Sequence, residues 1–213
     1  MMAFREAHDA AARSELYRVF ADALEYPDAA LQKFLAQGGL NVALSRSLGR
    51  LCPDLVARVA APALRDVPDL EQLQSDYLFL FEVGTNGTPP CPLFGGTFGG
   101  IDRRVVMEEC VRFYEHFGLK IDPGVKEMPD ALGTQLEFLH FMSYSRAHSA
   151  DDELEASAYR RGESDFLERH LGRWLPQMRK ELEKQSIGPW YREVIGLLGD
   201  SVELFLRDRV RHS

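Results

Sequence analysis

Apolar residues recur three and four positions apart along almost the whole chain, the spacing that places them on one face of an α-helix. The clearest stripes cover residues 16–24, 73–81, 105–117, 132–143, 166–182 and 194–206. No stretch of the sequence alternates apolar and polar residues for long enough to indicate a β-strand. The pattern therefore predicts an all-α fold, a single helical unit of about eight to ten helices.

Most prolines fall between the apolar stripes, as expected for residues that end helices. Two prolines are exceptions. Pro62 interrupts an alanine-rich segment, and Pro176 follows Trp174 and Leu175 inside a strong helical pattern. Because a proline inside a helix removes a hydrogen bond and crowds the preceding turn, we expect a kink or a short break at Pro176.

Two stretches lack helical periodicity. Residues 84–100, GTNGTPPCPLFGGTFGG, hold six of the seventeen glycines and three of the eleven prolines, and long loops of this kind usually have a function. Leu93, Phe94 and Phe98 indicate that this loop packs against the protein. Residues 120–131 form a hinge between an N-terminal helical subdomain (1–119) and a C-terminal one (132–213). Such a connector permits either a monomer or a domain-swapped homodimer.

Charge and cysteine content narrow the function classes. The 213 residues include 25 Lys plus Arg and 33 Asp plus Glu, which gives a net charge of −8 and leaves no basic block for nucleic acid or anionic lipid. The three cysteines are too few and too scattered for a disulfide framework, which indicates a reducing compartment. With no signal peptide and no run of 18 apolar residues, we expect a cytoplasmic protein that does not insert into membranes.

The sequence contains little that supports a catalytic function. Glu137-Phe138-Leu139-His140 is a Glu-x-x-His motif of the kind found in diiron helical bundles, but such a site needs two copies and the chain has one. The sequence holds no Gly-x-Ser-x-Gly elbow and no cysteine in a recognisable Cys–His signature. We therefore expect a protein that is not an enzyme, with no bound cofactor and no metal.

For two further residues, a structural role is the simpler interpretation. Asp102 follows Gly99-Gly100 and is placed to cap the helix after it, although an anion at that helix N-terminus stays open. His170 lies between Leu167 and Leu171 on an apolar face, which favours a core histidine with one hydrogen bond.

The Glu127-Met128-Pro129-Asp130 segment admits two interpretations. The residue before a proline is driven out of the helical region, so Asp130 is placed to cap a helix that begins near Ala131. Alternatively, Asp130 and the nearby Glu127 form one wall of a groove for a basic peptide.

Four segments resemble the TorD/DmsD/NarJ family of cytoplasmic chaperones for molybdoenzymes. They are YRVFADALEYP (17–27), YLFLFEVG with the following PPCPLFGG (77–96), EMPDALGTQLEFL (127–139) and FLERHLGRWLP (166–176). The third is similar to the family's Glu-x-Pro-Asp-His signature, with Ala131 in place of the histidine, and the fourth to its Phe-x-x-x-His-Leu-x-x-Trp pattern. The loop is most similar to that of the branch serving ethylbenzene or dimethyl sulfide dehydrogenases and selenate or chlorate reductases.

The resemblance implies a TorD-like, all-α chaperone of two subdomains that turns over no substrate. Members bind the molybdenum-containing catalytic subunit of an oxidoreductase, at its twin-arginine leader or on the body of the apo-subunit. They keep that subunit competent for insertion of molybdopterin guanine dinucleotide and for assembly or export. A non-chaperone peptide-binding module of the same fold and a helical-bundle metalloenzyme are the alternatives.

A leader peptide with an arginine pair and an apolar stretch requires carboxylates and an apolar groove. Asp130 and Glu127, on either side of Met128 and Pro129, could supply the carboxylates. The apolar groove would be formed by Tyr77, Phe81, Leu93, Phe94 and Met128. Core packing is the alternative for Tyr77 and Phe81, and Trp174 is assigned to the core.

Overall fold

The computed structural model describes residues 2–122, 124, 127–149 and 151–211. In chain order the helices are α1 (Met2–Ala23), α2 (Ala29–Ala36), α3 (Gly39–Leu51), α4 (Val56–Val59), α5 (Pro62–Arg65), α6 (Leu70–Tyr77), α7 (Arg103–His116), α8 (Leu132–His148), α9 (Glu153–Arg169), α10 (Leu171–Glu183) and α11 (Pro189–Arg211). A π-helical turn, η2 (Leu78–Glu82), extends α6, and η1 (Pro53–Leu55) and η3 (Gly95–Thr97) are 3₁₀ turns. The described residues contain no β-strand, so the all-α prediction is confirmed.

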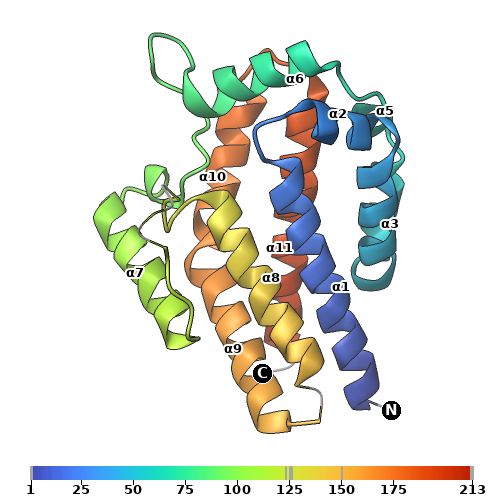
Figure 1. The fold of residues 1–213 in the computed structure, drawn as a ribbon, viewed down its shortest axis with the longest axis vertical. Coiled ribbons are helices and arrows are strands. Elements are labelled where there is room, and N and C mark those ends of the chain that lie inside the picture. The colour runs from blue at the N-terminus through green and yellow to red at the C-terminus, as the bar shows by residue number, and fades with distance from the viewer. Residues whose placement is uncertain (1, 123, 125–126, 150, 212–213) are drawn as a thin grey trace.

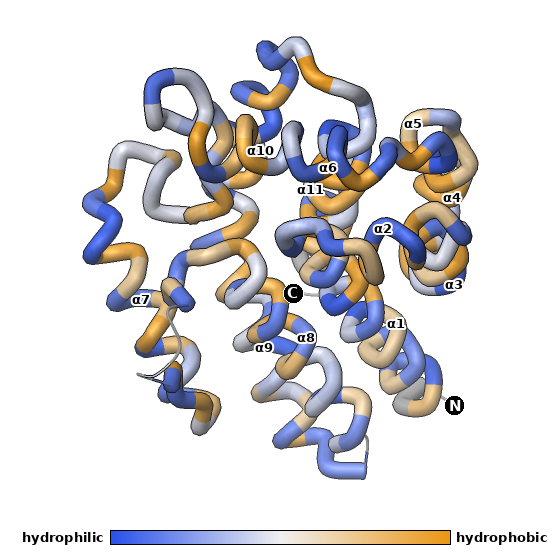
Figure 2. Tube along the Cα trace, turned by 45° about the horizontal axis from the view of Figure 1, so that its top comes forward, coloured by the Kyte–Doolittle hydropathy of each residue, from blue (hydrophilic) through white to orange (hydrophobic). Residues whose placement is uncertain are grey.

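The long helices lie side by side along the longest axis of the molecule (Figure 1). Helix α1 packs against α8 and α3, α8 packs against α9, and α10 packs against α11. Helix α6 crosses one end of this bundle, and α7 lies at its flank, on the side away from α3 (Figure 1). Along α7, hydrophilic and hydrophobic positions alternate by turn, as expected of a helix with one packed face (Figure 2).

The hydrophobic core is continuous across the predicted hinge. The α1–α8 contact joins an element from residues 1–119 to one from residues 132–213, and α11 packs against α5 in the same way. A buried ion pair also joins the two parts of the chain: Arg13 on α1 reaches Glu163 on α9 at 2.8 Å between Nη1 and Oε1. The Tyr17 hydroxyl donates to the same Glu163 oxygen at 2.9 Å. The two predicted subdomains therefore share one interior.

Aspartates begin several helices, as their side chains accept from the free backbone N–H groups of the first turn. Asp28 accepts from Leu31 N, and Asp69 accepts from Gln72 N. Asp102 accepts from Arg104 N at 2.8 Å, which confirms its predicted capping role. At α8 the capping interpretation of Asp130 is wrong: the N-cap position is held by Ala131, which has no side-chain acceptor, and the Asp130 carboxylate is turned instead to Arg103.

The helical stripe at residues 166–182 is broken before Pro176, earlier than the proline predicts. Helix α10 runs without interruption through Pro176, so the short break expected there is absent. The chain breaks instead at His170, whose φ of −118° and ψ of −92° separate α9 from α10. Pro176 consequently lies in the second turn of a new helix rather than in the middle of a long one.

Candidate functional site

The glycine- and proline-rich loop leads from η2 to α7 and hydrogen-bonds to both η2 and the start of α8. At one end, Cys91 N–H donates to the carbonyl of Leu80 at 2.9 Å. At the other, Gly95 N–H donates to the carbonyl of Asp130, and Leu132 N–H donates to the carbonyl of Leu93, both at 2.8 Å. The prediction that this loop packs against the protein is therefore confirmed: it hydrogen-bonds to residues 130–132, and its turn η3 packs against α7 and α10.

Asp130 lies inside this junction, with a fully buried side chain. Its carboxylate accepts two hydrogen bonds from the Arg103 guanidinium, at 2.8 Å from Nε to Oδ2 and 3.0 Å from Nη2 to Oδ1. Gly96 N–H donates to the same Oδ2 at 3.1 Å. The guanidinium also lies 4.2 Å from the centroid of the Phe94 ring, and the Arg103 side chain keeps 38% of its surface exposed. The carboxylate predicted to meet a client arginine is thus paired with an arginine of this chain.

Glu127 lies on the exposed side of the same junction, close to three other exposed carboxylates. The pKa of Glu137 on α8 is raised by partial burial and then by the negative charges of Glu127, Glu25 and Asp22. Among the described residues, none of these four carboxylates forms an ion pair within 4.0 Å. We call Asp22, Glu25, Glu127 and Glu137 the acidic surface; a cluster of like charges without ion pairs among the described residues favours a basic partner.

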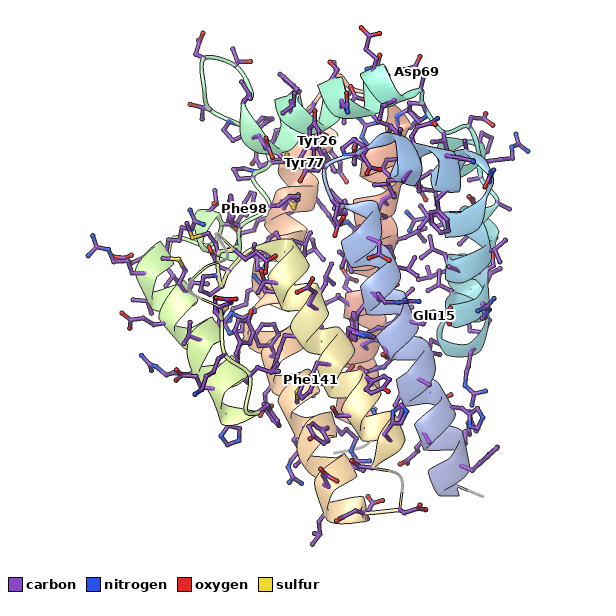
Figure 3. All side chains as sticks on the ribbon, in the orientation of Figure 1. Glu15, Tyr26, Asp69, Tyr77, Phe98 and Phe141 are labelled. Carbon is purple, nitrogen blue, oxygen red and sulfur yellow. The ribbon has the colours of Figure 1, made fainter. Side chains whose placement is uncertain are left out.

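Tyr77 and Phe81 are buried in the core. Their rings lie 5.0 Å apart, and the Phe81 ring lies 5.3 Å from that of Tyr191 on α11. Burial raises the pKa of Tyr77 to about 12, with smaller contributions from Glu82 and Glu25. Tyr26, 46% exposed, lies 5.4 Å from Tyr77 between ring centroids, and Figure 3 shows the two side by side where α6 crosses the bundle. This aromatic cluster therefore borders the acidic surface at Glu25.

The remaining predicted binding residues gather around the loop junction. Leu93 and Phe94 are partly buried, and Met128 is exposed. The carbonyl of Pro129 accepts from the Tyr114 hydroxyl at 2.7 Å. Pro129 also borders an open groove of about 510 Å³ whose other walls are side chains of α7, including Met107 and Val111. The structure thus brings together residues 93–94 and 127–130, whereas Tyr77 and Phe81 belong to the aromatic cluster.

Sequence reasoning missed three members of the acidic surface, Asp22, Glu25 and Glu137. In the sequence, Glu137 stands out only as half of a Glu-x-x-His motif with His140. In the structure His140 is held by α1, with Nδ1 2.8 Å from the Ser14 hydroxyl and 2.9 Å from the Ser14 carbonyl. No local signal identifies the surface, because it forms only where the end of α1 meets α8.

Within the described part of the chain, no group of three or more His, Cys, Asp or Glu side chains is placed to hold a metal ion. No helix among these residues has the length and apolar character needed to cross a bilayer.

Fold and site together define an all-α protein with a cluster of exposed carboxylates on one surface. The family profile described as "Nitrate reductase delta subunit" matches residues 41–180, about two thirds of the chain. The chain belongs to this family, which confirms the resemblance to the TorD and NarJ type of protein.

Three curated relatives match nearly the whole chain. The perchlorate reductase assembly chaperone protein of Dechloromonas aromatica is 30% identical over 201 residues, covering 92% of this chain and 89% of its own length. The selenate reductase assembly chaperone protein of Thauera selenatis is 30% identical and covers 88% and 84%. The chlorate reductase assembly chaperone protein of Ideonella dechloratans is 31% identical and also covers 88% and 84%.

Proposed function

We propose that the protein is a system-specific chaperone for the catalytic subunit of a molybdenum-containing reductase. The observation that carries this proposal is the likeness, over 88% or more of the chain, to three relatives named assembly chaperones of perchlorate, selenate and chlorate reductases. In this role the protein turns over no substrate and works in the cytoplasm. It keeps the apo-subunit competent for insertion of molybdopterin guanine dinucleotide and for assembly or twin-arginine export.

The acidic surface supports a basic leader peptide as one contact with the client. Its four carboxylates are exposed and free of ion pairs among the described residues, so an approaching arginine displaces no internal cation from them. Uncompensated like charges attract a cationic partner from a distance and accelerate its encounter. The exposed Tyr26 and Met128 side chains border this surface and offer apolar area to the uncharged part of the leader.

Asp130 requires a different mode of binding, because its carboxylate is buried and paired. A client guanidinium reaches it only by exchange with Arg103, whose partly exposed side chain can swing toward solvent. In this proposal Arg103 holds the carboxylate in place until a client arginine replaces it. Phe94, which lies against the Arg103 guanidinium, would then stack on the incoming arginine.

The groove between Pro129 and α7 supports contact with the apolar stretch of the leader. It is bordered by Met107, Val111 and Pro129, with Arg104 and Glu108 at its rim. A methionine in such a groove adapts to different apolar side chains. The oligomeric state in this proposal is a monomer or a homodimer swapped at residues 120–131.

The test is a calorimetric titration with synthetic leader peptides of the reductase subunits encoded near this protein. The variant Glu127→Gln/Glu137→Gln removes two charges from the acidic surface. The control Glu115→Gln/Glu153→Gln removes two exposed carboxylates elsewhere, at the end of α7 and the start of α9. If each contact contributes about 0.5–1 kcal/mol, the first variant weakens binding about tenfold and the control leaves it unchanged.

Equal affinities of the two variants would remove the acidic surface from the interaction. Absence of binding by the wild type to every leader would move the contact to the body of the apo-subunit. A tagged pull-down from a host that expresses the reductase then tests the chaperone role itself. Failure to recover the catalytic subunit in that experiment would contradict the proposed function.

A further inference from the structure

The first part of the glycine- and proline-rich loop forms a small exposed hairpin at residues 85–88. Thr88 N–H donates to the carbonyl of Thr85 at 3.2 Å, and these two residues form an isolated β-bridge. Between them lie Asn86 and Gly87, with φ of 55° and 77°. Positive φ at both central positions is typical of a two-residue type I′ turn, for which Asn-Gly is a preferred sequence. Asn86 is also the only non-glycine residue with a positive φ in the described part of the chain.

The hairpin is held only at its two ends. Val83 N–H donates to the carbonyl of Leu78 at 2.7 Å, and Cys91 N–H donates to the carbonyl of Leu80 at 2.9 Å, so the chain is anchored to η2 on both sides. Among the described residues, the bond within the turn is the only backbone hydrogen bond that residues 85–88 form. An exposed turn closed by one hydrogen bond opens locally at low cost.

Asn86 and Gly87 carry an electrophile and a nucleophile on adjacent residues. No described residue bonds to the Asn86 side-chain amide or accepts a hydrogen bond from Gly87 N–H. Gly87 has no side chain, and even an added Cβ would meet nothing within 4 Å, so the nitrogen is sterically accessible. The other asparagine of the chain differs in each respect. Asn41 lies in α3, precedes Val42, and donates its side-chain amide to the carbonyl of Val59 at 2.7 Å.

We propose that Asn86 is a site of spontaneous deamidation. When the turn opens, the Gly87 nitrogen loses its proton to a solvent base and attacks Cγ of Asn86. The new N–Cγ bond closes a five-membered succinimide ring, and the Cγ–Nδ2 bond breaks as ammonia leaves with a proton from solvent. Water then opens the ring: cleavage of the N–Cγ bond gives aspartate, and cleavage of the bond from N to the main-chain carbonyl carbon gives isoaspartate. The net reaction consumes one water and releases one ammonia.

The reaction changes the loop in two ways. Both products add a carboxylate to an exposed turn, and isoaspartate also routes the main chain through Cγ, which lengthens the backbone by one methylene and abolishes the turn geometry. Because the anchors at Val83 and Cys91 lie outside residues 85–88, the change stays confined to the hairpin. This inference goes beyond the proposed function, since it requires no client protein and uses none of the residues of the acidic surface.

Incubation of the folded full chain, followed by trypsin and mass spectrometry, tests the proposal. Cleavage after Lys and Arg places Asn41 in peptide 34–46 and Asn86 in peptide 66–103. We expect peptide 66–103 to gain nearly one dalton, as both isoaspartate and aspartate, at least tenfold faster than peptide 34–46. The rate should rise from neutral to mildly alkaline pH and stay within tenfold of that of a synthetic peptide of residues 83–91. Equal rates in the two tryptic peptides, or a rate more than tenfold below the synthetic peptide, would overturn the proposal.

Two variants and a control assign the reaction to this turn. Asn86→Gln should abolish the mass gain in peptide 66–103, because attack on the longer side chain would require a six-membered ring. Gly87→Ala strains the turn but crowds the attacking nitrogen, so it should slow the gain at least tenfold, whereas Gly49→Ala, in open space on α3, should leave it unchanged. An undiminished rate in Gly87→Ala would refute the mechanism. A converted sample should keep the urea midpoint of fresh protein, and a lower midpoint would refute confinement to the hairpin.

Discussion

The Asp130–Arg103 ion pair predicts a large coupling energy between two residues that lie 27 positions apart. The Asp130 carboxylate is completely buried and accepts three hydrogen bonds, two from Arg103 and one from Gly96. Arg103→Met keeps an apolar stem against Phe94 but leaves the carboxylate buried without its cation, which costs about 3–5 kcal/mol. Asp130→Asn removes the charge and keeps an acceptor for Gly96, so we expect a smaller loss of about 1.5–3 kcal/mol.

The assay is urea unfolding of the wild type, both single variants and the double variant, followed by circular dichroism. Once Asp130 is neutral, Arg103 has little left to stabilise, so the double variant should be more stable than Arg103→Met alone. The cycle should give a coupling energy of about 2–3 kcal/mol. Additive effects within about 0.5 kcal/mol would refute the reasoning, because they would mean that the two groups do not interact in solution.

Three further predictions concern other buried groups. Glu163→Gln leaves Arg13 buried without its counter-ion and should lower the free energy of unfolding by about 3–5 kcal/mol in urea; a loss below about 1 kcal/mol would contradict this. The pKa of His170 is lowered from 6.5 to about 4, so its stabilising contribution is present above pH 6.5 and is lost as the pH falls toward 4. Between about pH 7 and about pH 5 the free energy of unfolding of the wild type should therefore fall by about 2 kcal/mol more than that of His170→Phe. Equal losses of the two proteins in parallel urea titrations would show that His170 is not responsible. Burial raises the pKa values of Cys91 and Cys110 to about 12, so a thiol reagent should label them only after denaturation; rapid labelling of the native protein would contradict their burial.

The loop at residues 84–100 packs against two separate parts of the fold. Phe98 stacks on Trp174 of α10, with ring centroids 5.8 Å apart, and Leu93 and Gly95 hydrogen-bond to residues 130–132. A side chain at position 95 would meet Gln135 Nε2 at 2.9 Å and Trp174 Nε1 at 3.0 Å, so only glycine permits this approach.

The secondary structure could be predicted from the sequence because helical periodicity is a local property. The stripes at residues 132–143 and 194–206 lie within helices of the structure, and those at 16–24 and 105–117 extend one residue beyond theirs. Asp102 was predicted correctly as a cap, since the N–H group that it accepts from lies two residues away. Trp174 is in the core, as its apolar context predicts.

Local chemistry gave the wrong role for Asp130 and the wrong position for the helix break. The Asp130 carboxylate could either cap the next helix or pair with Arg103, and the second choice was decided by the loop that brings Arg103 to it. Pro176 is tolerated within α10 because the chain had already broken at His170. In both cases the competing interaction comes from a distant segment, which a local pattern does not contain.

The sequence by itself determined the helices, the acidic net charge, the packed loop and the family. Only the tertiary structure decided that Asp22 and Glu25 near the end of α1 lie close to Glu137 on α8, and that the Asp130 carboxylate is paired with Arg103. The physical reason is that helix formation depends on neighbours three and four residues away. Charge clusters and buried ion pairs depend instead on which helix faces meet when the whole core is packed.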